Sequence, residues 1–198
     1  MIKKPDEKLP HAFMAIPGFE PDDDGNGHKQ DSAAGKVWIR NLRPNDMIFE
    51  SEMFGSINIS YIYRRIQAKN WKTFELPVAS ILHNISRRYI DKKYASALPT
   101  ERLEVPVLVS FSDTGLEVID GVHRIHRLAA LAATNAKAYF VPPSLIREAR
   151  IRKFRIDQTG VWVDDDTMNS DDFEKAMKGA ENFIKTIPMA VLAKLSGM

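Results

Sequence analysis

Residues 105–134 read VPVLVSFSDTGLEVIDGVHRIHRLAALAAT, and this stretch decides the fold. The valine-rich run at 105–111, the turn cluster at 112–115 and the apolar run at 116–119 are typical of a β-hairpin. An Asp-Gly turn at 120–121 then leads into a segment with helical periodicity, which predicts a helix over about 122–134 that stops at Asn135. The stretch therefore predicts two paired strands, a tight turn and a helix.

The flanking sequence extends this pattern in both directions. Downstream, a strand is expected at 136–141, a short strand at 161–163 and a helix at about 170–196 that breaks at Pro188. Upstream, we expect short strands at 37–39 and 74–78, a strand passing into a helix between 49 and 72, and a helix that spans Leu82, Ile85, Tyr89 and Tyr94. Strands and helices of this kind predict an α+β protein with a small mixed sheet and packed helices.

The N-terminal segment has a different composition. Residues 1–36 hold four prolines and the acidic run DDDGNG at 22–27, too few apolar groups to offset the entropy of ordering. The run matches the first half of a calcium-binding loop, but position twelve is Ala33 instead of Glu, which favours a solvated loop. We expect a mobile arm over 1–36, a domain over 37–160 and a C-terminal helical extension over 161–198.

Composition excludes several classes of function. The chain has no cysteine, so disulfides, thiolate metal sites and cysteine nucleophiles are ruled out. No apolar run approaches the roughly 18 residues of a membrane span, and the lysines near the start precede no apolar run. We expect a cytoplasmic protein without a membrane span.

The formal charge is only +2, so affinity for nucleic acid must come from local clusters.

The helix that follows Asp120-Gly121 predicts an anion site. At 100° per residue its apolar residues share one face, while His123, Arg124 and Arg127 lie on the other. The first turn of a helix carries unpaired amides and partial positive charge. Gly121 and Val122 would offer those amides to a phosphate, and Arg124 would bind its oxygens. An ordinary Asp-Gly turn before a surface helix is the alternative.

Three residue types in this region allow further chemistry. Asp120 is able to cap the helix, hold a metal or position water. Glu117 and Asp120 are the carboxylates we would test first for Mg²⁺. His123 and His126 have a spacing that allows a shared metal, or either acts as a general acid or base near neutral pH.

Two basic clusters are candidate nucleic-acid contacts. The first comprises Arg87, Arg88, Lys92 and Lys93, and the second runs from Arg147 to Arg155 and includes Arg150 and Arg152. Tyr89 and Phe154 lie among them and are able to stack on bases. A solvated helix face and a charged edge strand explain the same residues without DNA.

The succession EVPVLV at 104–109, hairpin, and LEVIDGVHRIHRLAA at 116–130 resembles the ParB/sulfiredoxin (ParB N-terminal-like) superfamily. Gly121 and Arg124 match its Gly-x-x-Arg turn, and Ala129 and Ala130 fall where the family has alanines. Residues 75–81 resemble its opening strand, and the resemblance covers about 74–145. The resemblance implies a ParB/sulfiredoxin-like fold.

The same resemblance implies nucleotide handling. Members bind or hydrolyse ATP or CTP, and some bind or cut DNA or act as phosphotransferases. Val122 stands where sulfiredoxins have cysteine, which rules out sulfinic-acid repair. Val122 and His123 stand where partition proteins have Glu and Arg, His126 replaces another Arg, and no helix-turn-helix module follows. The chain resembles small plasmid- or phage-encoded members, including a fertility-inhibition protein whose ATPase and DNase activities block conjugative DNA transfer.

The leading hypothesis is therefore an enzyme that hydrolyses ATP or another nucleoside triphosphate with Mg²⁺ and binds or cuts DNA. Its predicted catalytic residues are Glu117, Asp120, His123 and Arg124, and a protein of a conjugation or secretion apparatus is an expected partner. One alternative is a non-catalytic inhibitor that works through the N-terminal arm and the apolar C-terminal residues Phe183, Ile184, Ile187, Met189, Val191, Leu192 and Leu195. The other is DNA binding without turnover.

Overall fold

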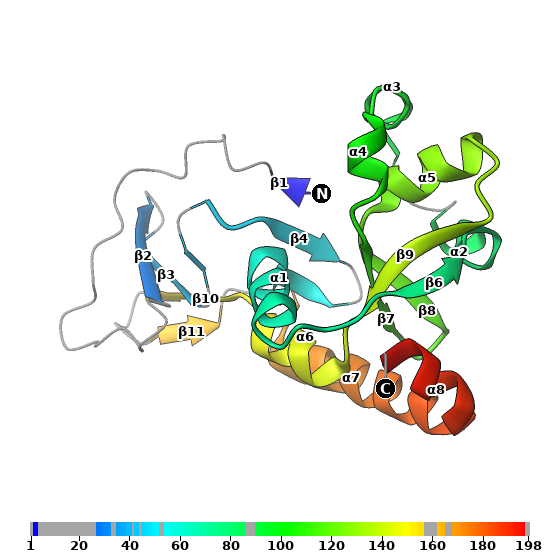
Figure 1. The fold of residues 1–198 in the computed structure, drawn as a ribbon. Coiled ribbons are helices and arrows are strands. Elements are labelled where there is room, and N and C mark those ends of the chain that lie inside the picture. Colours follow the sequence, from blue (N-terminus) through cyan, green and yellow to red (C-terminus); the bar gives the residue numbers. More distant parts are fainter. Residues whose placement is uncertain are drawn as a thin grey trace. The chain divides into compact units, whose positions relative to one another are not determined.

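The computed structural model describes residues 2–3, 27–32, 35–40, 42–43, 45–51, 54–85, 90–156, 162–164 and 168–196. They belong to two compact units. Unit 1 combines Met1–Arg65 with Ser144–Lys175, and unit 2 combines Ile66–Pro143 with Ala176–Met198. Both mix strands and helices, so the predicted α+β class is confirmed (Figure 1).

Unit 2 is built on a sheet of four strands: β6 (Phe74–Pro77), β7 (Val107–Phe111), β8 (Leu116–Asp120) and β9 (Asn135–Phe140). The spatial order is β6-β9-β7-β8. β7 and β8 form the predicted antiparallel hairpin, whereas β7 and β9 run parallel. The predicted small mixed sheet is therefore confirmed.

Helices α2 (Val78–Ile85) and α5 (Val122–Ala130) pack with this sheet. They bury the apolar stripe that the helical periodicity predicts, because Ile81, Ile85 and Ile125 share one core with the strands. The buried members of that core are Leu76, Val78, Ile81, Ile85, Val107, Val109, Val118, Ile125, Ala136 and Ala138.

Helix α5 ends earlier than its periodicity predicts. Ala132 has a left-handed φ of 55°, and the amides of Ala132 and Ala133 donate to the carbonyls of Ala129 and Leu128, each at 3.0 Å. These two bonds close the helix end in the manner of a Schellman motif. The chain therefore turns away before residue 134, and β9 begins at Asn135.

The predicted helix through Leu82 and Tyr94 is divided. Helix α2 starts at Val78, directly after β6, and residues 86–89 lie outside the described part of the chain. Helices α3 (Lys92–Ser96) and α4 (Thr100–Leu103) follow. The side chain of Asp91 accepts a hydrogen bond of 2.9 Å from the Tyr94 amide. This N-cap starts a new helix where periodicity alone suggested continuity.

Unit 1 contains two further sheets. One has the order β1-β4-β5, formed by Ile2–Lys3, Ile48–Ser51 and Gly55–Asn58. The other has the order β11-β10-β3-β2, formed by Trp162–Asp164, Arg152–Ile156, Gly35–Arg40 and Gly27–Ser32. Every pairing in both sheets is antiparallel.

Most of the remaining helices match the sequence pattern, but the short helix at Pro143–Ala149 was not predicted. Helix α1 (Ile59–Ala68) follows β5 directly, which confirms the predicted change from strand to helix. Helix α6 spans Pro143–Ala149. Helices α7 (Ser170–Thr186) and α8 (Met189–Ser196) are separated at Pro188, as predicted. In the described part of the chain, no helix combines the length and the hydropathy needed to span a bilayer.

The segment predicted as an arm contains regular structure. β1, β2 and the first residues of β3 lie within 1–36, where β2 pairs with β3 and β1 pairs with β4. Backbone hydrogen bonds of a strand ladder form whatever the side chains are, so the low apolar content did not reveal them. β2 pairs with β3 across the predicted boundary between residues 36 and 37. β10 pairs with β11 across the predicted boundary between residues 160 and 161. Residues 22–26 of the acidic run lie outside the described part.

A network around Asp46 joins the loop before β4 to helix α1. The Asp46 carboxylate accepts hydrogen bonds from the Asn58 side chain at 2.6 Å and the Arg43 amide at 3.1 Å. Both terminal nitrogens of Arg64 donate to it, at 2.6 and 3.1 Å. Burial by itself raises the pKa of Asp46, but the bonds from Arg64 and Asn58 outweigh burial and hold that pKa below its ordinary value of 3.8. Asp46 is thus a buried, ionised anchor.

Candidate functional site

The turn between β8 and α5 places Gly121 at the start of the helix. Gly121 has a φ of 103° and is the N-cap residue, and its carbonyl accepts the first helical bond from Ile125 at 2.9 Å. A Cβ added to Gly121 would lie 2.5 Å from Val107 Cγ1 and 2.8 Å from Arg124 Nη2. Both the backbone conformation and the packing therefore require glycine here.

Asp120 does not cap the helix, which was one of its predicted roles. Its carboxylate accepts a hydrogen bond of 2.8 Å from Arg124 Nη2, one helical turn along the chain. The Asp120 and Arg124 side chains are only 15% and 13% exposed, so the pair is shielded from most solvent screening. The same nitrogen of Arg124 lies 3.5 Å from the Pro106 carbonyl. The predicted anion-binding arginine thus holds an internal carboxylate.

A shift in strand register determines where the two candidate carboxylates lie. Leu108 pairs with Asp120, but Val109 pairs with Val118, so Ile119 is an extra residue in β8. Glu117 then lies opposite Ser110. Because Leu108 and Ser110 are two residues apart in β7, Glu117 and Asp120 share one face of the sheet. Regular alternation would have put them on opposite faces.

His123 connects α5 to the loop before α3. Its Nε2 accepts a hydrogen bond of 3.2 Å from the Asp91 amide, and its ring meets Tyr94 edge to face with centroids 5.1 Å apart. Burial lowers the pKa of His123 below its ordinary value of 6.5; the Asp91 carboxylate opposes this shift and His126 adds to it. The neutral imidazole is the form that accepts the Asp91 amide, so His123 positions α3.

We expect the imidazole resonances of His123 to titrate below pH 6.5 in an NMR experiment. The folded-state pKa is lowered, so the contact with Asp91 contributes stability above pH 6.5 and loses it as the pH falls through the folded pKa. The Asp91 amide resonance should shift with the same midpoint. His123→Gln, whose side-chain oxygen also accepts hydrogen bonds, should remove that midpoint. A His123 pKa above 6.5 would contradict this account.

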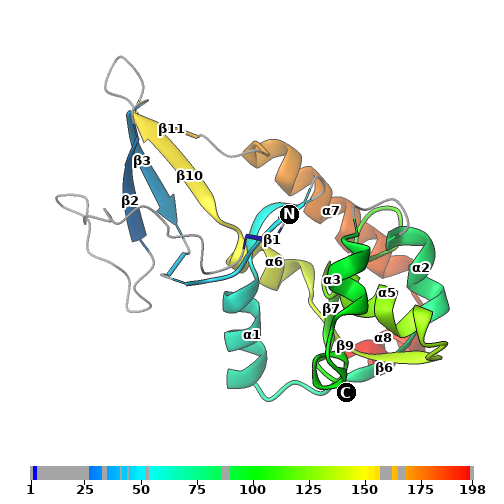
Figure 2. The same cartoon turned by 90° about the horizontal axis from the view of Figure 1, so that it is seen from above.

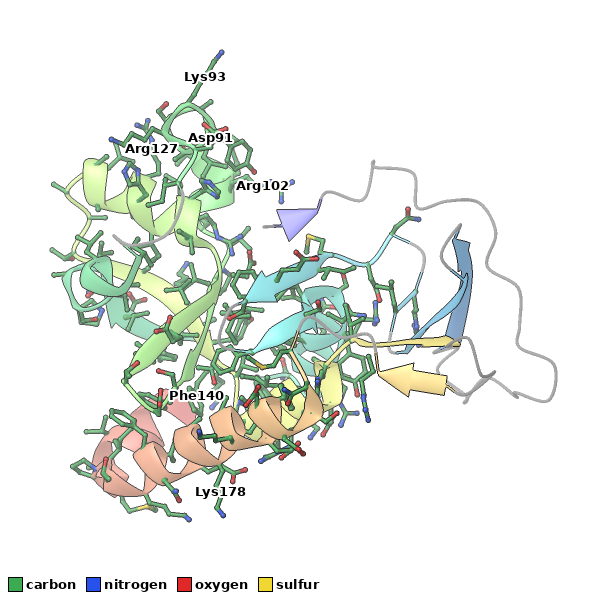
Figure 3. All side chains as sticks on the ribbon, turned by 180° about the vertical axis from the view of Figure 1, so that it is seen from behind. Asp91, Lys93, Arg102, Arg127, Phe140 and Lys178 are labelled. Carbon is green, nitrogen blue, oxygen red and sulfur yellow. The ribbon has the colours of Figure 1, made fainter. Side chains whose placement is uncertain are left out.

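Cationic side chains lie on α5 and on the two short helices α3 and α4, which pack against it; Arg127 belongs to the last turn of α5. Lys92, Lys93 and Arg102 are exposed, and Arg127 is half-buried with an Nε that has no hydrogen-bond partner among the described residues. Figure 3 shows Asp91, Arg127 and Lys93 at the same end of unit 2, with Lys93 pointing away from α3. Val122, which has a predicted role in phosphate binding, also packs against the hydrophobic core of unit 2.

The two predicted DNA-binding clusters have different outcomes. Arg87 and Arg88 lie outside the described residues, as does Tyr89. Arg150 is only 6% exposed, donates to the Met168 carbonyl at 2.7 Å and lies 4.2 Å from the centre of the Phe173 ring. Its buried guanidinium is a structural cation, which corrects the prediction of a DNA contact. Arg152 donates to Ser170 Oγ at 3.0 Å.

The structure therefore gathers Asp120, Gly121, Val122, His123, Arg124 and Arg127 in unit 2, with Lys92 and Lys93 nearby on α3. The sequence did not indicate Asp91 or Tyr94 as neighbours of His123. Asp91 and Tyr94 are three residues apart, which is the spacing between an N-cap residue and the amide that it caps, and this spacing indicates a helix start. The apolar periodicity continues across Asp91, however, and suggested one uninterrupted helix.

The described residues contain no cluster of three or more metal-ligating side chains. Comparisons with known protein families, with curated proteins and with solved structures found no match to this chain.

Proposed function

We propose that the first turn of α5 binds the phosphates of a nucleotide such as ATP together with Mg²⁺, and that the protein hydrolyses this nucleotide while binding or cutting DNA. The observation that carries the proposal is the position of Arg124. Its guanidinium already holds a carboxylate 2.8 Å away at the start of a helix of nine residues. A phosphate oxygen has the charge and geometry to take the place of that carboxylate.

The ion pair suggests how ligand and metal would bind together. Asp120 and Arg124 neutralise each other in the ion pair. Mg²⁺ prefers carboxylate oxygens and phosphate prefers guanidinium, so a Mg²⁺–nucleotide complex offers each partner a replacement. Glu117, on the same face of β8 as Asp120, would reach the same ion directly or through water. The amides of Val122 and His123 would face the phosphate.

This proposal includes a ParB/sulfiredoxin-like fold for unit 2. The order of a valine-rich strand, a hairpin, a Gly-x-x-Arg turn and an alanine-rich helix supports it. A role in blocking conjugative DNA transfer, with a protein of that apparatus as partner, extends the same resemblance.

The test measures ATP binding, ATP turnover and plasmid nicking for wild type, Arg124→Ala and Asp120→Asn. We expect Arg124→Ala to weaken ATP binding by about tenfold or more, because a charge-assisted hydrogen bond contributes roughly 1.5–3 kcal/mol. Asp120→Asn should bind ATP more tightly than wild type without Mg²⁺, since Arg124 is released, and should lose Mg²⁺-dependent turnover.

Lys137→Ala is the matched control, because Lys137 also pairs with a carboxylate in unit 2, at 2.8 Å from Glu104. It should behave as wild type in all three assays. If neither wild type nor Asp120→Asn binds ATP, the internal ion pair is purely structural and the proposal fails. The non-catalytic alternative would then be favoured, for which the exposed Met189 and Val191 of α8 offer an apolar contact surface.

A further inference from the structure

Tyr94 of α3 is an aromatic residue at the surface of unit 2. Its exposed fraction is 44%, whereas every other Phe, Tyr or Trp whose side chain the structure describes is buried or half-buried. A single exposed apolar side chain needs no special explanation by itself. The position of this ring, however, relates it to the start of α5.

Three contacts hold Tyr94 in place. Its amide donates a hydrogen bond of 2.9 Å to the Asp91 carboxylate, and the Asp91 amide donates one of 3.2 Å to His123 Nε2. The His123 ring in turn meets the Tyr94 ring edge to face, with the centroids 5.1 Å apart and the planes at 87°. The three residues thus form a closed set of contacts. A ring that is already ordered in this way loses less conformational entropy when a ligand binds to it.

His123 connects this ring to the first turn of α5. It is the second residue of that helix, and its amide is one of the two that would face a phosphate. Helix α3 lies beside α5 in both Figure 1 and Figure 2, and the two helices pack together. A single imidazole therefore separates the Tyr94 ring from the backbone that would bind phosphate.

We propose that Tyr94 stacks on the base of the nucleotide whose phosphates bind at the first turn of α5. This inference rests on the function proposed above, and it adds that the site recognises a nucleotide by its base as well as by its phosphates. Every base has a face that stacks on an aromatic ring. The apolar gain grows with the area that is covered, so the larger purine face is favoured over a pyrimidine.

Inorganic tripolyphosphate separates the two parts of the site, because it carries phosphates without a base. Isothermal titration calorimetry with Mg²⁺ measures the affinities of each variant for ATP and for tripolyphosphate. The ATP affinity reports both parts of the site, whereas the tripolyphosphate affinity reports the first turn of α5 alone. In wild type, ATP should bind more tightly than CTP.

Tyr94→Leu is the decisive variant, because leucine retains an apolar side chain against His123 but has no aromatic face. Its affinity for ATP should fall about fivefold or more, which corresponds to about 1 kcal/mol, the lower end for one base stacked on an aromatic ring. Its affinity for tripolyphosphate should not change. The difference between ATP and CTP should disappear. Tyr94→Phe keeps the ring and should bind both nucleotides as wild type does.

Leu131→Ala is the matched control. Leu131 is also an exposed apolar side chain of unit 2, with an exposed fraction of 53%, and it lies at the C-cap of α5. Its removal should leave the affinities for ATP and tripolyphosphate unchanged. Unchanged tripolyphosphate binding in Tyr94→Leu also shows that the start of α5 remains folded, which separates the loss of a stacking surface from a structural defect.

The proposal is overturned if Tyr94→Leu binds ATP as wild type does, or if it loses ATP and tripolyphosphate to the same extent. A Tyr94→Leu variant that keeps its ATP affinity but binds oligo(dT) more weakly would assign the ring to DNA and would also overturn it. In each of these cases wild type still binds ATP, so the proposed phosphate site stands. If wild type binds neither ATP nor tripolyphosphate, the phosphate site fails and this inference fails with it.

Discussion

Replacing Asp46 with alanine is expected to lower the free energy of unfolding by about 3 kcal/mol, within the range for breaking a buried ion pair. Asp46 is 8% exposed and accepts bonds from Arg43, Asn58 and Arg64. Alanine removes the acceptor of the bonds from Asn58 and Arg64, and a hydrogen bond to a charged group contributes about 1.5–3 kcal/mol. Part of the Arg64 guanidinium recovers hydration, because its side chain is 35% exposed. Urea unfolding at pH 7 measures the loss.

Asp46→Asn provides the control, because it keeps the shape and removes the charge. The folded-state pKa of Asp46 lies below 3.8, so the ionised carboxylate stabilises the protein above that pH and loses its contribution as the pH falls through the folded pKa. The stability difference between wild type and Asp46→Asn should therefore be full at pH 7 and shrink below pH 3.8. A difference that stays constant down to pH 2 would show that the charge plays no part.

The second large effect is expected for Gly121→Ala. An alanine at φ 103° is strained by roughly 1–2 kcal/mol, and its Cβ would overlap Val107 Cγ1 at 2.5 Å. Overpacking of this kind typically costs about 1–3 kcal/mol more, so a total loss near 3 kcal/mol is expected in urea unfolding. The start of α5 would also shift, which should reduce ATP binding together with stability.

Gly115→Ala separates the two causes. Gly115 has a φ of 138°, but a Cβ there meets no atom within 4 Å. This variant therefore reports backbone strain without overlap, and it should be clearly less destabilised than Gly121→Ala. Equal losses in the two variants would mean that the contact with Val107 relaxes at no cost.

Local patterns predicted the parts of the fold that local physics decides. The hairpin of β7 and β8 and the helix after Gly121 follow from short-range alternation, turn residues and an apolar stripe. Pro188 separates α7 from α8 because proline has no backbone N–H to donate to a helical hydrogen bond. The helical periodicity that predicted the buried face of α5 also predicted that Arg124 and Arg127 lie on its other face.

The features that depend on distant partners were not predictable. The pairing of Arg124 with Asp120 competes with helix capping, and only the three-dimensional arrangement shows which contact forms. The extra residue at Ile119 is visible only against its partner strand. In the sequence, Arg150 resembles the other cations of its cluster. Only the fold shows that the Phe173 ring packs against its guanidinium. The strands β1 and β2 carry little apolar signal of their own.

The division into units has a consequence for the order of synthesis. Each unit takes its residues from two stretches, so unit 1 is incomplete until 144–175 has been made and unit 2 until 176–198 follows. β3 cannot form its pairing with β10 until that strand, more than a hundred positions later in the chain, has been synthesised. The growing polypeptide thus exposes an unpaired edge of β3 until β10 has been synthesised, a period in which nascent chains are prone to aggregate.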